Sequence, residues 1–117
     1  MDGGLSTARI YHITSEEAWL SQKNDPAYRG DTLESEGFIH CSTRDQVAAT
    51  ANRYYRGVHG LVLLEIDAHS LASPLRYEQV PGVGSFPHIY GPLNRDAVTQ
   101  VFRFEPGLDG SFTFPEE

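Results

Sequence analysis

Residues 60–67 constrain the fold more than any other segment of this 117-residue chain. In an extended conformation their aliphatic side chains fall on both faces, with Val62, Leu64 and Ile66 on one face and Leu61 and Leu63 on the other. A strand that is apolar on both faces is typical of the middle of a sheet, where other layers cover it on each side. We therefore expect residues 60–67 to form a central strand.

Shorter segments rich in β-branched and aromatic residues predict the remaining strands. These segments are 9–13, 38–41, 74–78 as an edge strand, 88–90, 97–105 and 111–114. Between two of them, residues 80–87 contain closely spaced glycines and prolines, which predict a loop.

Capping-box patterns place the first helices in the N-terminal half of the chain. Thr14, followed three residues later by Glu17, predicts a helix over 15–22. A similar pattern at 31–34 predicts one or two helical turns, which Gly37 would end in a left-handed conformation.

The clearest helix is expected over residues 44–56, where Thr43 and Gln46 form another capping box. Its apolar stripe would consist of Val47, Ala51, Tyr54 and Tyr55. Helices early in the chain and strands late in it favour an α+β fold with a mixed or antiparallel sheet and two to three short helices.

Length and charge limit the classes of function. We expect one domain over 9–115, preceded by a disordered polar tail over 1–8. The formal charge of −7 argues against non-specific binding to nucleic acids. The single cysteine, Cys41, suits a reducing cytoplasm, and the longest aliphatic run, 61–64, is far too short to cross a membrane. A soluble, cytoplasmic protein is expected, with an oligomeric state that the sequence leaves open.

Three histidines, His12, His40 and His88, each lie in a short apolar segment. We expect these segments to converge on one polar pocket, with Tyr90 beside His88 on a proline-rich platform that can grip a ligand ring. The alternative for His12 is a half-buried histidine bonded to the backbone. A metal site formed by these three histidines is the less favoured alternative, because no His-x-His or His-x-x-x-His pair is present, and no metal is expected.

Strand alternation sorts the side chains of 38–42. Phe38, His40 and Ser42 share one face, whereas Cys41 points to the other. Cys41 is therefore expected to pack as a small buried apolar residue, and His40 and Ser42 are expected to face the pocket.

The motifs IYHIT at 10–14, GFIHCST at 37–43 and FPHIYGPL at 86–93 together resemble the family known as domain of unknown function 952. That family looks like a small relative of the ADP-ribosyltransferase fold, which includes the RNA 2′-phosphotransferases. In that fold one strand carries Tyr-His-Gly-Thr, similar to 11–14 here, and another carries His-x-His-Leu-Ser, similar to 38–42. The resemblance implies an NAD- or nucleotide-dependent transferase that moves ADP-ribose or phosphate.

By this resemblance His12 would bind a ribose hydroxyl, Ser42 would hold the nicotinamide side and His40 would line the cleft. His12 and His40 are thus the catalytic candidates. The expected ligand-binding residues are Tyr11, Thr14, Phe38, Ser42, His88 and Tyr90.

The sequence departs from the fold's pattern at two points. Ile13 replaces a glycine that lets a nucleotide approach the backbone, and no glutamate lies in an obvious catalytic motif. The candidate carboxylates are Glu65, Glu78 and Glu105, and the arginines near the motifs are Arg9, Arg29 and Arg44. Two alternatives stay open: a domain that binds a nucleotide, sugar phosphate or small anion without catalysis, and a protein-interaction domain whose histidines lie far apart.

Overall fold

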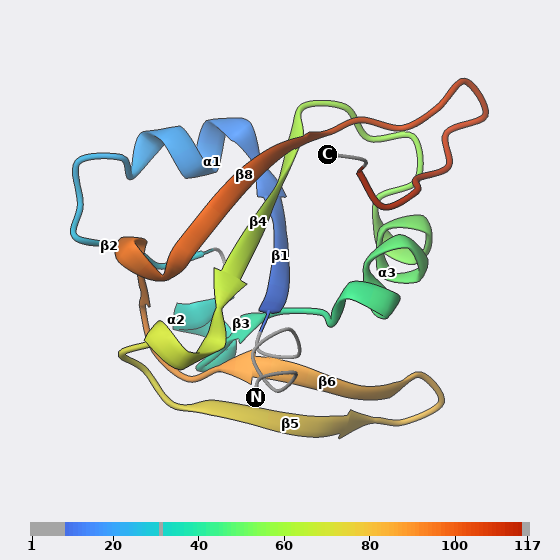
Figure 1. Ribbon diagram of the computed structural model, residues 1–117. Coiled ribbons are helices and arrows are strands. Elements are labelled where there is room, and N and C mark those ends of the chain that lie inside the picture. Colours follow the sequence, from blue (N-terminus) through green and yellow to red (C-terminus); the bar gives the residue numbers. More distant parts are fainter. Residues whose placement is uncertain (1–8, 31, 116–117) are drawn as a thin grey trace, which may run out of the picture.

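A computed structural model describes residues 9–30 and 32–115 of the chain (Figure 1). Its strands are β1 (Arg9–Ser15), β2 (Ala27–Tyr28), β3 (Ile39–His40), β4 (Leu61–Asp67), β5 (Leu75–Val80), β6 (Gly84–Ile89), β7 (Leu93–Asn94) and β8 (Val98–Phe104). Its helices are α1 (Glu16–Ser21), α2 (Leu33–Glu36) and α3 (Val47–Tyr54), and 3₁₀ turns cover Arg44–Gln46, Ala68–Ser70 and Arg95–Ala97. The tail expected over 1–8 lies outside the described residues.

The prediction that residues 60–67 form a central strand is confirmed. β4 lies between β1 and β8 in an antiparallel sheet, and residues 61–66 are all buried. One face of β4 packs Leu64 into a core that includes Ile39, and the other packs Leu63 into a core that includes Val47 of α3. Burying a leucine side chain stabilises a fold by roughly 2 kcal/mol, so this strand anchors both cores.

A second antiparallel sheet has the order β3-β6-β5, and β2 pairs with β7. Figure 1 shows the long β5–β6 hairpin running below the first sheet. The two larger sheets meet at one antiparallel bridge between Tyr11 of β1 and Ser42. The main-chain N–H of Tyr11 donates to the Ser42 carbonyl over 2.8 Å, and the N–H of Ser42 donates to the Tyr11 carbonyl over 2.7 Å.

The start of α1 differs from the prediction. Ser15, rather than Thr14, caps the helix, because its Oγ accepts a hydrogen bond from the N–H of Ala18 over 3.0 Å. Thr14 is part of β1 and pairs with Val62, since the ladder to β4 continues through Ser15. By contrast, the predicted end of α2 is confirmed: Gly37 follows the helix with φ of 86°, in the left-handed region.

The predicted capping box before α3 is confirmed, and Gln46 Oε1 accepts from the N–H of Thr43 over 2.9 Å. The helix ends at Tyr54, two residues before the expected end at 56, and its first turn is 3₁₀. Val47 and Ala51 are fully buried, but Tyr54 is 63% exposed. The expected apolar stripe is therefore wrong at Tyr54, which lies about 100° around the helix from its neighbour Tyr55.

The loop expected over residues 80–87 is wrong, because most of it forms a hairpin turn and β6. Pro87 fits inside this strand since its carbonyl faces the N–H of Cys41, at 3.0 Å, and its ring nitrogen therefore faces the same way. Because these groups face the chain that continues β3 and not β5, the missing N–H removes no bond to β5.

The last expected strand, 111–114, is also absent from the described residues. Asn52 of α3 takes the place of a partner strand. Its Nδ2 donates to the Phe112 carbonyl over 3.0 Å, and its Oδ1 accepts from the Phe112 N–H over 2.7 Å. Phe112 is consequently buried without a ladder.

These elements define a small α+β fold with three helices in the N-terminal half and antiparallel sheets. The class expected from the sequence is thus confirmed, with antiparallel pairing throughout the described strands. Within 9–30 and 32–115, no helix has the length and apolar character needed to span a membrane.

Gly91 and Gly37 offer a matched test of the turns. Both have positive φ, but a Cβ at Gly91 would lie 2.9 Å from the Cβ of Ser73, whereas a Cβ at Gly37 would meet nothing within 4 Å. We expect Gly37→Ala to lower the free energy of unfolding by about 1 kcal/mol through backbone strain alone. Gly91→Ala should cost clearly more, because Ser73 also donates to the Pro92 carbonyl and is held in place.

Urea denaturation of both variants measures the difference. Adding Ser73→Gly to Gly91→Ala should recover part of the loss, because it removes the clashing side chain. Equal losses in Gly37→Ala and Gly91→Ala would contradict the packing argument.

Candidate functional site

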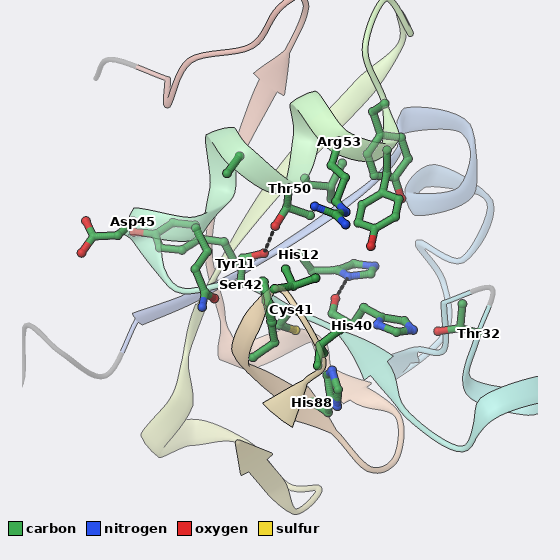
Figure 2. Close-up of a pocket in the computed structure, with 18 of the residues that line it drawn as sticks. Tyr11, His12, Thr32, His40, Cys41, Ser42, Asp45, Thr50, Arg53 and His88 are labelled. Carbon is green, nitrogen blue, oxygen red and sulfur yellow. Dashed lines mark hydrogen bonds between the residues drawn. The ribbon is translucent and has the colours of Figure 1, made fainter. Parts of the chain in front are cut away.

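A cavity of about 580 Å³ lies between α3, the free edge of β1, β3 and the β5–β6 hairpin. Figure 2 shows Thr50 and Arg53 reaching from α3 toward His12, His40 and Ser42, which come from the two sheets. A volume of this size matches a small-molecule site.

The structure brings most of the predicted site residues to this cavity. Those that line it are Tyr11, His12, His40, Ser42 and His88. The other three do not line it: Thr14 contacts Tyr28, Phe38 stacks on His88 with ring centroids 4.2 Å apart, and Tyr90 contacts Glu78. The three histidines therefore line one cavity. The alternative of a protein-interaction domain predicted that these histidines would lie far apart.

His12 has both ring nitrogens engaged inside the protein. Nδ1 lies 2.6 Å from the carbonyl oxygen of His40, which can only accept, so Nδ1 carries the proton. Nε2 lies 3.2 Å from the hydroxyl of Tyr28, which in turn lies 2.8 Å from Thr14 Oγ1. His12 is buried and ties β1 to β3 and β2. This geometry favours a positioning role for His12.

His88 forms a carboxylate–imidazole pair. Its Nδ1 lies 2.7 Å from Glu78 Oε1, which also accepts from the hydroxyl of Tyr90 over 2.6 Å. The hydrogen bond from Tyr90, followed by that from His88, holds the pKa of Glu78 below the usual glutamate value. An ionised Glu78 fixes the proton of His88 on Nδ1, which leaves Nε2 as a lone-pair nitrogen suited to proton transfer.

His40 pairs with His88 across β3 and β6, and the two rings contact edge to face at 5.2 Å. Its Nε2 lies 3.0 Å from Glu36 Oε1, and its side chain is half exposed. Two histidines, each with its own carboxylate, therefore stand side by side on the cavity wall. Each imidazole of the pair can exchange a hydrogen bond with a ligand in the cavity.

Cys41 is buried and packs in the core, as expected. Burial raises the pKa of its thiol well above the ordinary cysteine value. The thiol is thus neutral and a poor nucleophile.

The main chain of Ile13 presents an open strand edge to the cavity. Residues 12, 14 and 16 direct their main-chain groups toward β4, as the bond from the Glu16 N–H to the Gly60 carbonyl shows, whereas Tyr11 directs its groups toward Ser42. By the same alternation, the N–H and C=O of Ile13 face away from β4 on the Ser42 side. Ile13 lines the cavity, and no described group bonds these two atoms.

Sequence reasoning missed one wall of the cavity. It consists of a face of α3 and the hairpin, and its members are Gln46, Ala49, Thr50, Arg53, Tyr54, Val80, Val83 and Phe86. The polar spacing of Thr50 and Arg53, three residues apart, was the available signal. Glu36, which contacts His40, was not predicted because it lies in a short helix, whereas the candidate glutamates all lay in predicted strands.

The carboxylates and arginines considered from the sequence have other partners. Glu65 is buried against the hydroxyls of Tyr11 and Thr99, and Glu105 contacts His59. Arg9 pairs with Glu65 and Asp67, and Arg44 lies over the ring of Phe114. Neither these groups nor Arg29 line the cavity. Within the described residues, no cluster of three or more His, Cys, Asp or Glu is arranged to hold a metal ion.

The fold and the cavity define a small α+β protein with a histidine-lined pocket beside the open edge of a sheet. Residues 13–101 match the family model described as protein of unknown function DUF952. The chain therefore belongs to the DUF952 family.

Solved structures of one bacterial protein share this fold. The crystal structure of CC0527 from Caulobacter crescentus is 34% identical in sequence, with a TM-score of 0.82 over 90% of this chain and 93% of that one. A double mutant of CC0527 gives 33% identity and a TM-score of 0.81 over 90% and 93% of the two chains. Its solution NMR structure gives 34% identity and a TM-score of 0.78 over 91% and 92%. No curated protein matches the chain.

We expect His12→Phe to destabilise the protein by about 1–3 kcal/mol, because the ring volume is kept while the His40 carbonyl and the Tyr28 hydroxyl lose a buried partner. The matched control is His59→Phe, since the side chain of His59 is 75% exposed. That control should change the free energy of unfolding by no more than about 0.5 kcal/mol. Urea denaturation measures both, and an equal effect of the two substitutions would contradict the positioning role of His12.

Glu78 gives a prediction about pH. Its folded-state pKa is lowered, so its ionised form stabilises the fold above the unfolded pKa of about 4.3, and this contribution is lost as the pH falls through the folded value. The stability gap between wild type and Glu78→Gln should therefore be larger near about pH 7 than near about pH 3. Urea denaturation at both pH values tests this, and a gap that does not change with pH would contradict it.

Proposed function

We propose that the cavity binds NAD or a related nucleotide and that the protein transfers ADP-ribose from it, or transfers a phosphate onto that ADP-ribose. The ADP-ribosyltransferase-like arrangement implied by the YHIT and FIHCS motifs is part of this proposal. The observation that carries it is the open main-chain pair of Ile13 inside a pocket that also holds His12, His40 and Ser42.

A carboxamide is the natural partner of the Ile13 edge. A main-chain N–H and C=O on the same side of a strand offer one donor and one acceptor, and a primary amide such as that of nicotinamide offers the reverse pair. Buried main-chain groups are rarely left unpaired, so a ligand that completes this edge gains hydrogen bonds. The side chain of Ile13 does not block the approach, because it packs in the core with Val47 and Leu63.

Two kinds of side chain would contribute to the reaction, a carboxylate and a histidine. When the bond between ribose C1′ and the nicotinamide nitrogen breaks, nicotinamide leaves with the bonding electrons as a neutral molecule and positive charge develops on the ribose. Glu36, a cavity carboxylate, would stabilise that charge. The Nε2 of His88, with Nδ1 held by Glu78, would accept the proton of the incoming hydroxyl.

A second candidate is a binding domain without catalysis, which recognises a nucleotide, a sugar phosphate or another small anion. The engagement of both His12 nitrogens by protein groups favours it, because His12 then cannot exchange a proton with a ligand without breaking a buried contact. Glu36 is likewise occupied by His40.

Isothermal titration calorimetry with NAD and with ADP-ribose tests the proposal. We expect saturable binding, with nicotinic acid adenine dinucleotide binding about tenfold more weakly than NAD, since a carboxylate cannot donate to the Ile13 carbonyl. Release of nicotinamide on incubation would establish the transferase, and binding without release would establish the second candidate. Absence of binding at millimolar NAD and ADP-ribose would contradict the transferase.

A further inference from the structure

We propose that Arg53, Thr50 and Ser42 form an oxyanion subsite in the cavity, which takes the phosphate or carboxylate group of a ligand that also has an apolar or planar portion. This inference deepens the proposed function and rests on it, because the oxyanion would belong to the ligand of the same pocket. It adds a ligand-binding residue, Arg53, that neither the motifs nor the family description indicates.

Arg53 is the cation of the cavity. It alone among the lining residues is a lysine or an arginine. No described carboxylate forms an ion pair with it, although the chain has 16 acidic residues and a formal charge of −7. Its guanidinium carbon lies 5.9 Å from the ring centre of Tyr54, so its hydrogen-bond donors are not used in that contact.

Two hydroxyls complete the subsite. Thr50 precedes Arg53 by three residues on α3, which puts both side chains on one face of the helix, and Figure 2 shows both reaching into the cavity above Ser42. Ser42 is 4% exposed, and its Oγ lies 3.4 Å from Thr50 Oγ1, near the outer limit of a hydrogen bond. A buried hydroxyl with so long a contact can form a shorter hydrogen bond with an oxyanion that accepts from both hydroxyls.

The charge balance of the cavity permits an anion. Glu36 has His40 as its partner, at 3.0 Å, which leaves Asp45 as the other acidic residue of the lining. Arginine binds phosphate and carboxylate through two parallel N–H···O bonds, and these charge-assisted bonds are about twice as strong as neutral ones.

The surroundings of the subsite indicate what the anion is attached to. Tyr54, Phe86 and Val83 line the same cavity, and Tyr54 and Val83 have exposed apolar surface. Such a wall suits a ring or an aliphatic chain. A small ring that carries one oxyanion is therefore the simplest probe of the subsite.

Phenyl phosphate, benzoate and phenol make a suitable set, because they share the ring and differ in the charged group. Binding is followed by ¹H–¹⁵N NMR shifts of the wild-type protein, Arg53→Gln, Thr50→Val and the control Arg103→Gln. The control removes the same charge from an exposed position on β8 outside the cavity. We expect phenyl phosphate to bind wild type about tenfold or more tightly than phenol, with shifts at Ser42, Thr50 and Arg53.

Arg53→Gln should remove that preference, Thr50→Val should reduce it about threefold and Arg103→Gln should keep it. The ratio of phenyl phosphate to benzoate affinity tells whether phosphate or carboxylate is the better occupant. An equal preference in wild type and Arg53→Gln, or shifts confined to other surfaces, would overturn the proposal. The probes contain neither ribose nor carboxamide. Loss of phenyl phosphate binding in Arg53→Gln would therefore support the subsite even if NAD failed to bind. NAD binding that Arg53→Gln leaves unchanged would reject the subsite and leave the proposed function standing.

Discussion

The bridge between Tyr11 and Ser42 determines how the two sheets of this protein meet. It consists of one pair of main-chain hydrogen bonds, of 2.8 and 2.7 Å, at the edge of β1. Because the pairing stops there, the next outward-facing residue of β1, Ile13, keeps its edge open and a cavity forms where a further strand would otherwise lie. The histidines reach this cavity because β1, β3 and β6 all pass beside the bridge.

The same junction explains the two kinds of histidine. His12 lies within β1, where its ring bonds the His40 carbonyl and so ties β1 to β3. His40 and His88 lie across from each other on β3 and β6 and have carboxylate partners from other elements, Glu36 and Glu78. The first histidine thus holds the cavity in shape, whereas the other two present ionisable groups to it.

Much of the fold follows from local sequence, and the rest depends on tertiary contacts. The central position of β4, the Thr43–Gln46 cap and the glycine end of α2 are encoded by side chains within a few residues. The strand β6 was not predictable from its local sequence, because Pro87 is tolerated only where its ring nitrogen faces away from β5, and the strand pairing that decides this is a tertiary contact. The convergence of the three histidines was predictable from their matching strand positions, but Arg53 and Glu36 lie on helices whose orientation the sequence does not reveal.

The central claim is that the open edge of β1 at Ile13 is a ligand subsite. Hydrogen exchange of backbone amides tests it directly, because His12 and Thr14 donate into the ladder with β4 while the N–H of Ile13 faces the cavity. The account predicts that Ile13 exchanges faster than both neighbours in the free protein and is slowed to a similar rate by saturating NAD. Slow exchange of Ile13 without ligand, or no slowing by bound NAD, would contradict it.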